Sequence, residues 1–217
     1  MFDLYLFDLD GTLVDTRRDI TTAVNHVMNL HSRPHAALDT VISWVGDGLD
    51  DMMARAFSTD DSEFIAELVD EFRTFYAEHC TDFSHLYDGC SETLASLRAS
   101  GSHLSVLTNK PQEISIEILR RLDIFEYFDH VVGPTEAELR KPNPSNLLSL
   151  MRDVGTITEQ TLMVGDSRND ILVAHNAGVP SCGCTFGYIG RTALLQLKPT
   201  YLIDTWPELL ALAAPGR

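Results

Sequence analysis

Two aspartates separated by one residue, Asp8 and Asp10, end an apolar segment near the N-terminus and carry the strongest chemical signal in this sequence. The preceding residues, 2–7, are rich in aromatic and aliphatic side chains, which is typical of a buried strand. Carboxylates spaced by two point the same way along extended backbone, and their charges repel unless a cation or a proton lies between them. Gly11 then lets the backbone turn away. We therefore expect a site for a hard divalent metal at this point.

Three further polar clusters follow predicted strands or precede predicted helices. They are Thr108-Asn109-Lys110, Lys141, and the stretch 166–170 with Asp166, Ser167 and Asp170. In an open α/β sheet the ligand crevice lies outside the carboxyl ends of the strands, so we expect the four clusters to meet at one edge.

This set of residues suits phosphoryl transfer. A transferring phosphoryl group needs a metal to neutralise its oxygens, fixed hydrogen-bond donors and a nucleophile in line with the leaving oxygen. Carboxylate ligands from Asp8, Asp10 and Asp166 fit Mg²⁺, and Lys141 adds a positive charge beside a helix N-terminus. An aspartate can itself attack phosphorus and form an aspartyl-phosphate.

Two sequence patterns along the chain predict the helices and strands that position these residues. Residues 15 to about 82 have helical periodicity, with two short helices within 41–57 that meet at Gly46-Asp47-Gly48. From about residue 86, short apolar runs alternate with helical patterns. We expect strands at 104–108, 130–132, 162–164, 180–184 and 201–203, and helices at 89–99, 111–122, 171–177 and 207–212, with another opened by Asn143-Pro144.

Alternating strands and helices predict a doubly wound parallel sheet of the Rossmann-like α/β class. The helical block interrupts this sheet after its first strand. We therefore expect a core formed by residues 1–14 and 84–217, and an all-helical cap formed by residues 15–83 above the Asp8 crevice. The chain crosses between them near residues 14–15 and 83–86, which we expect to act as hinges.

Composition excludes several classes of partner. The 217 residues are 44% hydrophobic, which is enough for a substantial core, and the formal net charge is −16. Such a surface disfavours nucleic acid and anionic membranes as partners. No N-terminal signal or membrane span is apparent, and the four cysteines have no CxxC spacing, so we expect reduced buried thiols and a cytoplasmic location.

The four polar clusters, in this order, resemble those of the haloacid dehalogenase superfamily of phosphohydrolases, and the early helical insertion resembles that family's small helical cap. The resemblance implies that Asp8 is the nucleophile and Asp10 the general acid and base. It implies that Mg²⁺ is held by Asp8, the backbone carbonyl of Asp10, and Asp166. Thr108 and Lys141 would then bind the phosphoryl group, with help from the backbone near Asn109. Supporting roles would fall to Gly11, Ser167 and Asp170, with Asp170 orienting Lys141 or a metal-bound water.

A finer resemblance extends into the cap. The stretches 41–48, 107–111, 165–171 and 185–188 are similar to those of the bacterial phosphoglycolate phosphatases. This likeness implies that 2-phosphoglycolate is the substrate and that Gly46, Asp47 and Gly48 form a substrate-facing loop. One departure is Ser145, where that family usually has an acidic residue soon after the prolines.

Other functions remain open at this stage. A sugar phosphomutase with the same core and cap would differ only in how well the closed cap excludes water from the aspartyl-phosphate. A pyrophosphatase or nucleotidase of the same superfamily is a further alternative, and so is a catalytically silent binding protein. In each enzymatic case the partner is a small phosphorylated metabolite, and the chain is a monomer or a homodimer.

Overall fold

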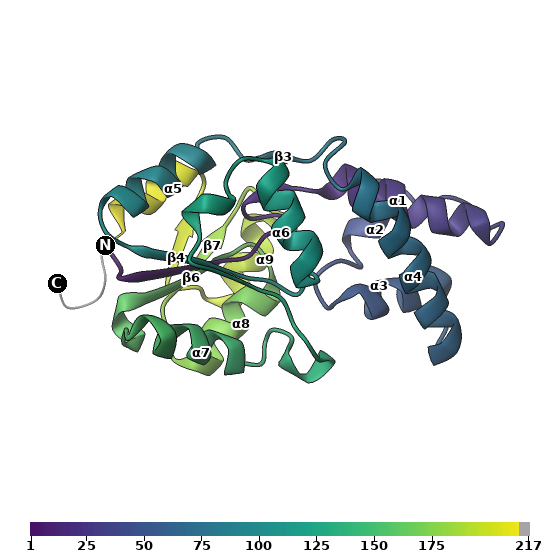
Figure 1. Cartoon of the computed structure of the whole chain (residues 1–217). Helices are drawn as coiled ribbons and strands as arrows, with labels where there is room; N and C mark the ends of the chain where they lie inside the picture. The colour runs from purple at the N-terminus through teal and green to yellow at the C-terminus, as the bar shows by residue number, and fades with distance from the viewer. Residues whose placement is uncertain (213–217) are drawn as a thin grey trace. The chain divides into compact units, whose positions relative to one another are not determined.

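The computed structural model describes residues 1–212 and places six parallel strands in one sheet (Figure 1). The strand order is β5-β4-β1-β6-β7-β8. The strands are β1 (Leu4–Phe7), β4 (His103–Leu107), β5 (His130–Val132), β6 (Thr161–Gly165), β7 (Ser181–Cys184) and β8 (Tyr201–Ile203). The α/β class predicted from the alternating pattern is thereby confirmed.

Helices cover both faces of the sheet, with α5 over one face and α7 and α8 over the other (Figure 1). The helices of this core are α5 (Cys90–Ala99), α6 (Gln112–Arg121), α7 (Ser145–Val154), α8 (Arg168–Ala177) and α9 (Gly190–Leu197). Short 3₁₀ turns lie at Phe125–Tyr127, Ala137–Leu139, Thr158–Gln160 and Trp206–Ala211. No described helix is both long enough and apolar enough to cross a bilayer.

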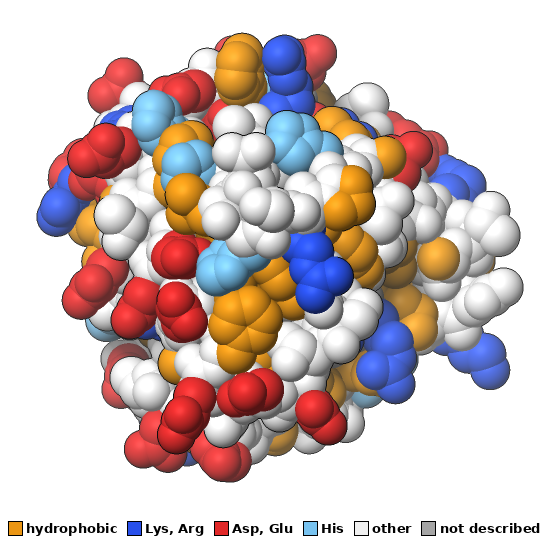
Figure 2. Space-filling model, turned by 90° about the vertical axis from the view of Figure 1, so that its right-hand side faces the viewer, with side chains coloured by type: hydrophobic (Ala, Val, Ile, Leu, Met, Phe, Trp, Pro, Cys, Tyr) orange, Lys and Arg blue, Asp and Glu red, His pale blue; other side chains and the backbone are white. Residues whose placement is uncertain are grey.

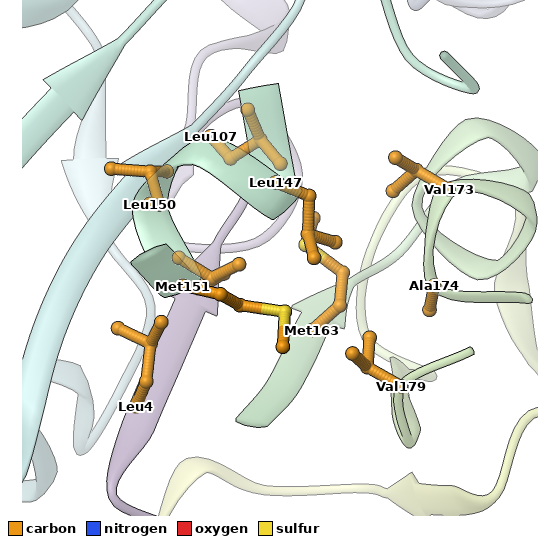
Figure 3. Packing of buried hydrophobic residues seen from close by; sticks show 10 residues of the cluster. Leu4, Leu107, Leu147, Leu150, Met151, Met163, Val173, Ala174 and Val179 are labelled. Atoms are coloured by element: carbon orange, nitrogen blue, oxygen red, sulfur yellow. The ribbon is translucent and has the colours of Figure 1, made fainter. Parts of the chain in front are cut away.

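Strand β1 lies in the middle of the sheet, between β4 and β6, and is buried on both faces. Leu4 and Leu6 belong to a buried cluster with side chains from α7, α8 and β6. Figure 3 shows Leu4 among its partners in this cluster. Tyr5 and Phe7 stack on the opposite face, with ring centroids 6.1 Å apart. Burying one such side chain contributes about 1.5–3 kcal/mol, so the end of β1 is firmly held. The residue that follows Phe7, Asp8, is therefore attached to a rigid strand.

The chain divides into two compact units: residues 1–15 together with the chain from 86 onward, and residues 16–85. The second unit is all helical and contains α1 (Arg17–Leu30), α2 (Leu38–Ile42), α3 (Leu49–Phe57) and α4 (Ser62–His79). Helix α4 begins at a well-formed cap, because the Asp61 carboxylate accepts hydrogen bonds from the N–H groups of Glu63 and Phe64. The face of the molecule drawn in Figure 2 shows many acidic side chains, with histidine and apolar groups between them.

The two segments that connect the units pair with each other. Strand β2 (Val14–Asp15) and strand β3 (His85–Leu86) form a two-stranded sheet. Within the helical unit, the buried carboxylate of Asp19 accepts hydrogen bonds from the backbone N–H groups of Phe83 and Ser84 and from the Ser84 hydroxyl. A single acidic side chain thus ties the start of α1 to the segment that leaves the helical unit.

Several predicted elements differ from those observed. The final helix predicted at 207–212 is a 3₁₀ helix, Trp206–Ala211, and helix α8 starts at Arg168 rather than at residue 171. Pro111, predicted as the first helical residue, is instead the N-cap of α6. Helix α9 and the two short strands β2 and β3 were not predicted, because an eight-residue helix and two-residue strands show too few periods to detect.

Candidate active site

Asp8 is the first residue after β1, and a tight turn follows it. Its backbone N–H donates to the carbonyl of Val164, which extends the pairing of β1 with β6 by one residue. The N–H of Leu9 donates to Asp8 Oδ1 at 2.8 Å. Gly11 has φ +82°, a left-handed conformation that glycine adopts without strain. The turn therefore holds the Asp8 carboxylate at the end of the central strand.

Lys141 reaches this carboxylate from the loop before α7. Its Nζ lies 3.0 Å from Asp8 Oδ1 and 2.6 Å from Asp170 Oδ1, and it donates to the carbonyl of Leu107 at 2.8 Å. The side-chain amide of Asn109 brackets the Lys141 backbone: its Nδ2 donates to the Lys141 carbonyl and its Oδ1 accepts from the Lys141 N–H. Both ends of this buried lysine are thus fixed.

Asp170 links this lysine to the start of α8. Its Oδ2 accepts hydrogen bonds from the N–H and the hydroxyl of Ser167, at 2.9 and 2.7 Å, in a capping box. Its other oxygen contacts Lys141. Because both oxygens are engaged, Asp170 orients the ammonium of Lys141 within a rigid helix start.

Asp166 follows β6 and is enclosed by two loops. Its Oδ1 accepts from the Thr12 hydroxyl at 3.0 Å, and its Oδ2 accepts from the N–H of Tyr188 at 2.6 Å. Glycines allow this close packing: a Cβ on Gly11 would lie 2.5 Å from Asp166 Oδ2, and one on Gly187 would lie 2.1 Å from the Asp166 Cβ. Thr12, Gly187 and Tyr188 are site residues that sequence reasoning did not single out, although they fall within recognised stretches.

The electrostatics of this cluster favour a cation. Ligand oxygens of Asp8, Asp166 and Asp170 lie within 4.8 Å of one another, and all three residues are buried. Burial, reinforced by the charge of Asp170 and only partly offset by Lys141, raises the pKa of Asp8 to about 6. Burial and the charges of Asp170 and Asp8 also raise the pKa of Asp166 well above its usual range.

Burial alone would lower the pKa of Lys141, but the charges of Asp170 and Asp8 outweigh that effect and raise it. Three buried carboxylates therefore lie within 4.8 Å of one another, and one buried ammonium contacts two of them, Asp8 and Asp170. The excess negative charge, carried by oxygen ligands, fits a hard divalent cation.

The Asp10 side chain is not one of the three clustered carboxylates, although its charge also raises the pKa of Asp8. Its two oxygens each accept a hydrogen bond from Lys110 Nζ at 3.0 Å. Thr108 is buried at the end of β4, and its hydroxyl accepts from the N–H of Lys110. The pairing of Lys110 with Asp10 was not predicted, because sequence spacing does not fix where a loop side chain points.

The predicted loop Gly46-Asp47-Gly48 lies in the helical unit, between α2 and α3. Both glycines have positive φ, +124° and +115°. The Asp47 carboxylate accepts a hydrogen bond from Arg55 of α3 at 2.5 Å, and Arg55 also donates to the carbonyl of Trp44. The loop therefore has a defined internal structure within its own unit.

Comparison with known proteins identifies the fold and chemistry of this arrangement. The family model described as haloacid dehalogenase-like hydrolase matches residues 5–184, which include all four polar clusters of the core. The chain belongs to the haloacid dehalogenase-like hydrolase family. The matched range includes the residues after β1 and β6, whose side chains the structure brings together.

Curated relatives of this hydrolase extend over nearly its whole length. A phosphoglycolate phosphatase from Mannheimia succiniciproducens is 35% identical over 219 residues, covering 96% of this chain and 97% of the relative. One from Colwellia psychrerythraea is 37% identical, with 96% and 95% covered. The crystal structure of a predicted phosphoglycolate phosphatase from Haemophilus somnus superposes with a TM-score of 0.90 at 33% identity, with 97% of each chain covered.

Proposed function

We propose that this hydrolase is a cytoplasmic, Mg²⁺-dependent phosphomonoesterase that converts 2-phosphoglycolate to glycolate and phosphate through an aspartyl-phosphate on Asp8. The observation that carries the proposal is the placement of Lys141, whose ammonium contacts both Asp8 and Asp170 beside the carboxylate of Asp166. Relatives with 35% or greater identity over nearly the full length bear the name phosphoglycolate phosphatase, which supports the choice of substrate.

In this mechanism Asp8 and Asp10 have distinct tasks. An Asp8 carboxylate oxygen attacks phosphorus, a new O–P bond forms, and the bond from phosphorus to the bridging oxygen breaks. Asp10 gives its proton to that bridging oxygen, and the alcohol leaves. Asp10 then takes a proton from a water molecule, whose oxygen attacks phosphorus and releases Asp8 and inorganic phosphate. The two steps return Asp8 to its carboxylate form and Asp10 to the protonated form in which it acts as the acid.

The remaining core residues bind and orient. Lys141 and the Thr108 hydroxyl would contact the oxygens of the transferring phosphoryl group. The side-chain amide of Asn109 is engaged with the Lys141 backbone, so we assign its contribution to its backbone N–H. Asp170 and Ser167 keep Lys141 in place, and Gly11 allows the turn that presents Asp8.

The carboxylates fit a magnesium ion, which would be held by Asp8, the backbone carbonyl of Asp10, and Asp166. When bound, the ion neutralises charge on the phosphoryl oxygens. The hydrogen bonds from Thr12 and Tyr188 would hold the Asp166 carboxylate in one orientation as a ligand.

Replacing Gly187 with alanine tests the role of Asp166. Because the new Cβ would lie 2.1 Å from the Asp166 Cβ, that side chain or the 187–188 loop must move. We expect Gly187→Ala to need about 10–100-fold more Mg²⁺ for half-maximal activity, as measured by magnesium titration. Gly178→Ala is the control: the positive φ of +71° makes alanine strained there, but its Cβ meets nothing within 4 Å, so it should lower stability and leave the magnesium requirement unchanged. Equal magnesium requirements in both variants would contradict the assignment of Asp166 as a magnesium ligand.

The helical unit has a proposed role in substrate selection. Its loop Gly46-Asp47-Gly48 is similar to the corresponding stretch of the phosphoglycolate phosphatases, so we assign it contact with the substrate. The unit as a whole would act as a cap over the core.

A phosphate-release assay over a panel of phosphomonoesters tests the proposed function. We expect kcat/KM to be highest for 2-phosphoglycolate, activity to disappear in EDTA, and Mg²⁺ to restore it. Activity that is indifferent to EDTA would remove the metal-dependent mechanism. A higher kcat/KM for a nucleotide or pyrophosphate would show that 2-phosphoglycolate is not the preferred substrate. Conversion of a hexose 1-phosphate to its 6-phosphate without free phosphate would identify a mutase.

A further inference from the structure

Lys110 forms a nearly buried ion pair with Asp10, next to the candidate nucleophile. The side chains are 7% and 12% exposed, and Lys110 Nζ lies 3.0 Å from each oxygen of the Asp10 carboxylate. The lysine backbone is fixed as well. Its N–H donates to the Thr108 hydroxyl, and its carbonyl packs so closely on Gly133 that a Cβ there would lie 2.5 Å away. The ammonium is therefore held beside Asp10.

The chemistry of the substrate gives this ammonium a second partner. In 2-phosphoglycolate one methylene group separates the bridging oxygen from the carboxylate carbon. Asp10 is the residue assigned to that bridging oxygen, so a cation in contact with Asp10 is also close to the substrate carboxylate. The formal net charge of the protein is −16, and a trianionic substrate needs local positive charge to bind.

The two lysines that contact Asp8 and Asp10 thus correspond to the two ends of the substrate. Lys141 contacts Asp8 and serves the phosphoryl end, whereas Lys110 contacts Asp10 and lies toward the leaving group. We propose that Lys110 binds the carboxylate of the leaving group and determines the preference of this enzyme for phosphorylated carboxylic acids. This inference rests on the proposed function and adds to it a specificity residue in the core.

A pair of matched substrates tests the role of Lys110. 2-Hydroxyethyl phosphate keeps the alkyl bridging oxygen of 2-phosphoglycolate but has no carboxylate. A hydrogen bond between charged groups corresponds to roughly 10–100-fold in affinity. In Lys110→Met we expect kcat/KM for 2-phosphoglycolate to fall by about that factor more than kcat/KM for 2-hydroxyethyl phosphate, mainly through KM. Lys110→Arg should recover part of the difference because it restores the charge.

The alternative is that Lys110 only positions Asp10. In that case both substrates would lose the same factor in Lys110→Met, and the proposal would be overturned. If the methionine variant does not fold, Lys110→Gln carries the same comparison, because it removes the charge and keeps a polar side chain. Lys198→Met, at an exposed lysine of the core, is the control and should match the wild type.

The wild-type enzyme separates this inference from the proposed function. A wild type that hydrolyses 2-hydroxyethyl phosphate as well as 2-phosphoglycolate would overturn the assigned substrate. A wild type that prefers 2-phosphoglycolate, with that preference unchanged in Lys110→Met, would overturn only the role of Lys110.

Discussion

Asp8→Asn is expected to lower kcat for 2-phosphoglycolate by about 10⁴-fold or more while leaving the protein folded. Asparagine has nearly the same shape as aspartate, but its neutral amide is a poor nucleophile toward phosphorus. The position remains at the end of β1, so substrate binding should change much less than turnover. Steady-state phosphate release, with circular dichroism as a check of folding, measures the effect. Turnover within tenfold of the wild type would show that Asp8 does not attack phosphorus.

The same substitution should stabilise the metal-free protein at neutral pH. Because burial raises the pKa of Asp8 to about 6, the folded state favours the protonated carboxyl more than the unfolded state does. That contribution to stability is complete below the unfolded pKa near 3.8 and is lost as pH rises through about 6.

At pH 7.5 the charged Asp8 therefore destabilises the metal-free fold, and Asp8→Asn removes this cost. We expect a gain of up to about 3 kcal/mol in the free energy of unfolding, measured in urea with EDTA, and no gain at pH 4. Asp153→Asn, at an exposed position of α7, serves as the control and should change stability by less than about 0.5 kcal/mol. A pH-independent effect of Asp8→Asn would contradict this electrostatic explanation.

Lys141→Met is expected to damage both stability and catalysis. Removing the ammonium leaves the buried carboxylates of Asp8 and Asp170 without the positive charge that contacts them, in a cluster that also contains Asp166. Removing one partner of a buried ion pair lowers the free energy of unfolding by about 3–5 kcal/mol. This loss of stability should become smaller toward low pH, because Asp8 and Asp166 take up protons there.

The catalytic effect of Lys141→Met should be about 10³-fold in kcat, because a charge aimed at the transferring phosphoryl group is lost. Urea unfolding at several pH values and kinetics at saturating Mg²⁺ measure the two effects separately. Lys198→Met again controls for the loss of a lysine at the surface. A variant of unchanged stability that retains wild-type turnover would show that Lys141 is not part of the site.

The main features of the core could be predicted because they depend on strand ends. Asp8, Lys141 and Asp166 each follow a strand or precede a helix, and parallel strands bring their carboxyl ends to one edge. The distances between their side chains could not be predicted, because these depend on how loops pack. Gly11 and Gly187 allow the loops to pack closely on Asp166. The sequence does not reveal this role, because it depends on how near the Asp166 side chain lies to each glycine in the fold.

The ion pair between Lys110 and Asp10 shows the limit of sequence patterns most clearly. Lys110 lies in a stretch similar to that of a known family, yet its spacing from Thr108 says nothing about the direction of its side chain. That direction comes from the hydrogen bond to the Thr108 hydroxyl and from the close packing on Gly133. The short strands β2 and β3 were missed for a different reason, since a strand of two residues shows too few periods to detect.

The central claim is that phosphorus becomes bonded to Asp8 during turnover. The most direct test is to quench the wild-type enzyme with acid while it hydrolyses 2-phosphoglycolate in Mg²⁺, reduce it with borohydride and map the peptides. Borohydride converts an aspartyl-phosphate to homoserine, so the mechanism predicts homoserine at position 8 in the wild type and none in Asp8→Asn. Homoserine at a different aspartate, or its absence from position 8 during active turnover, would contradict it.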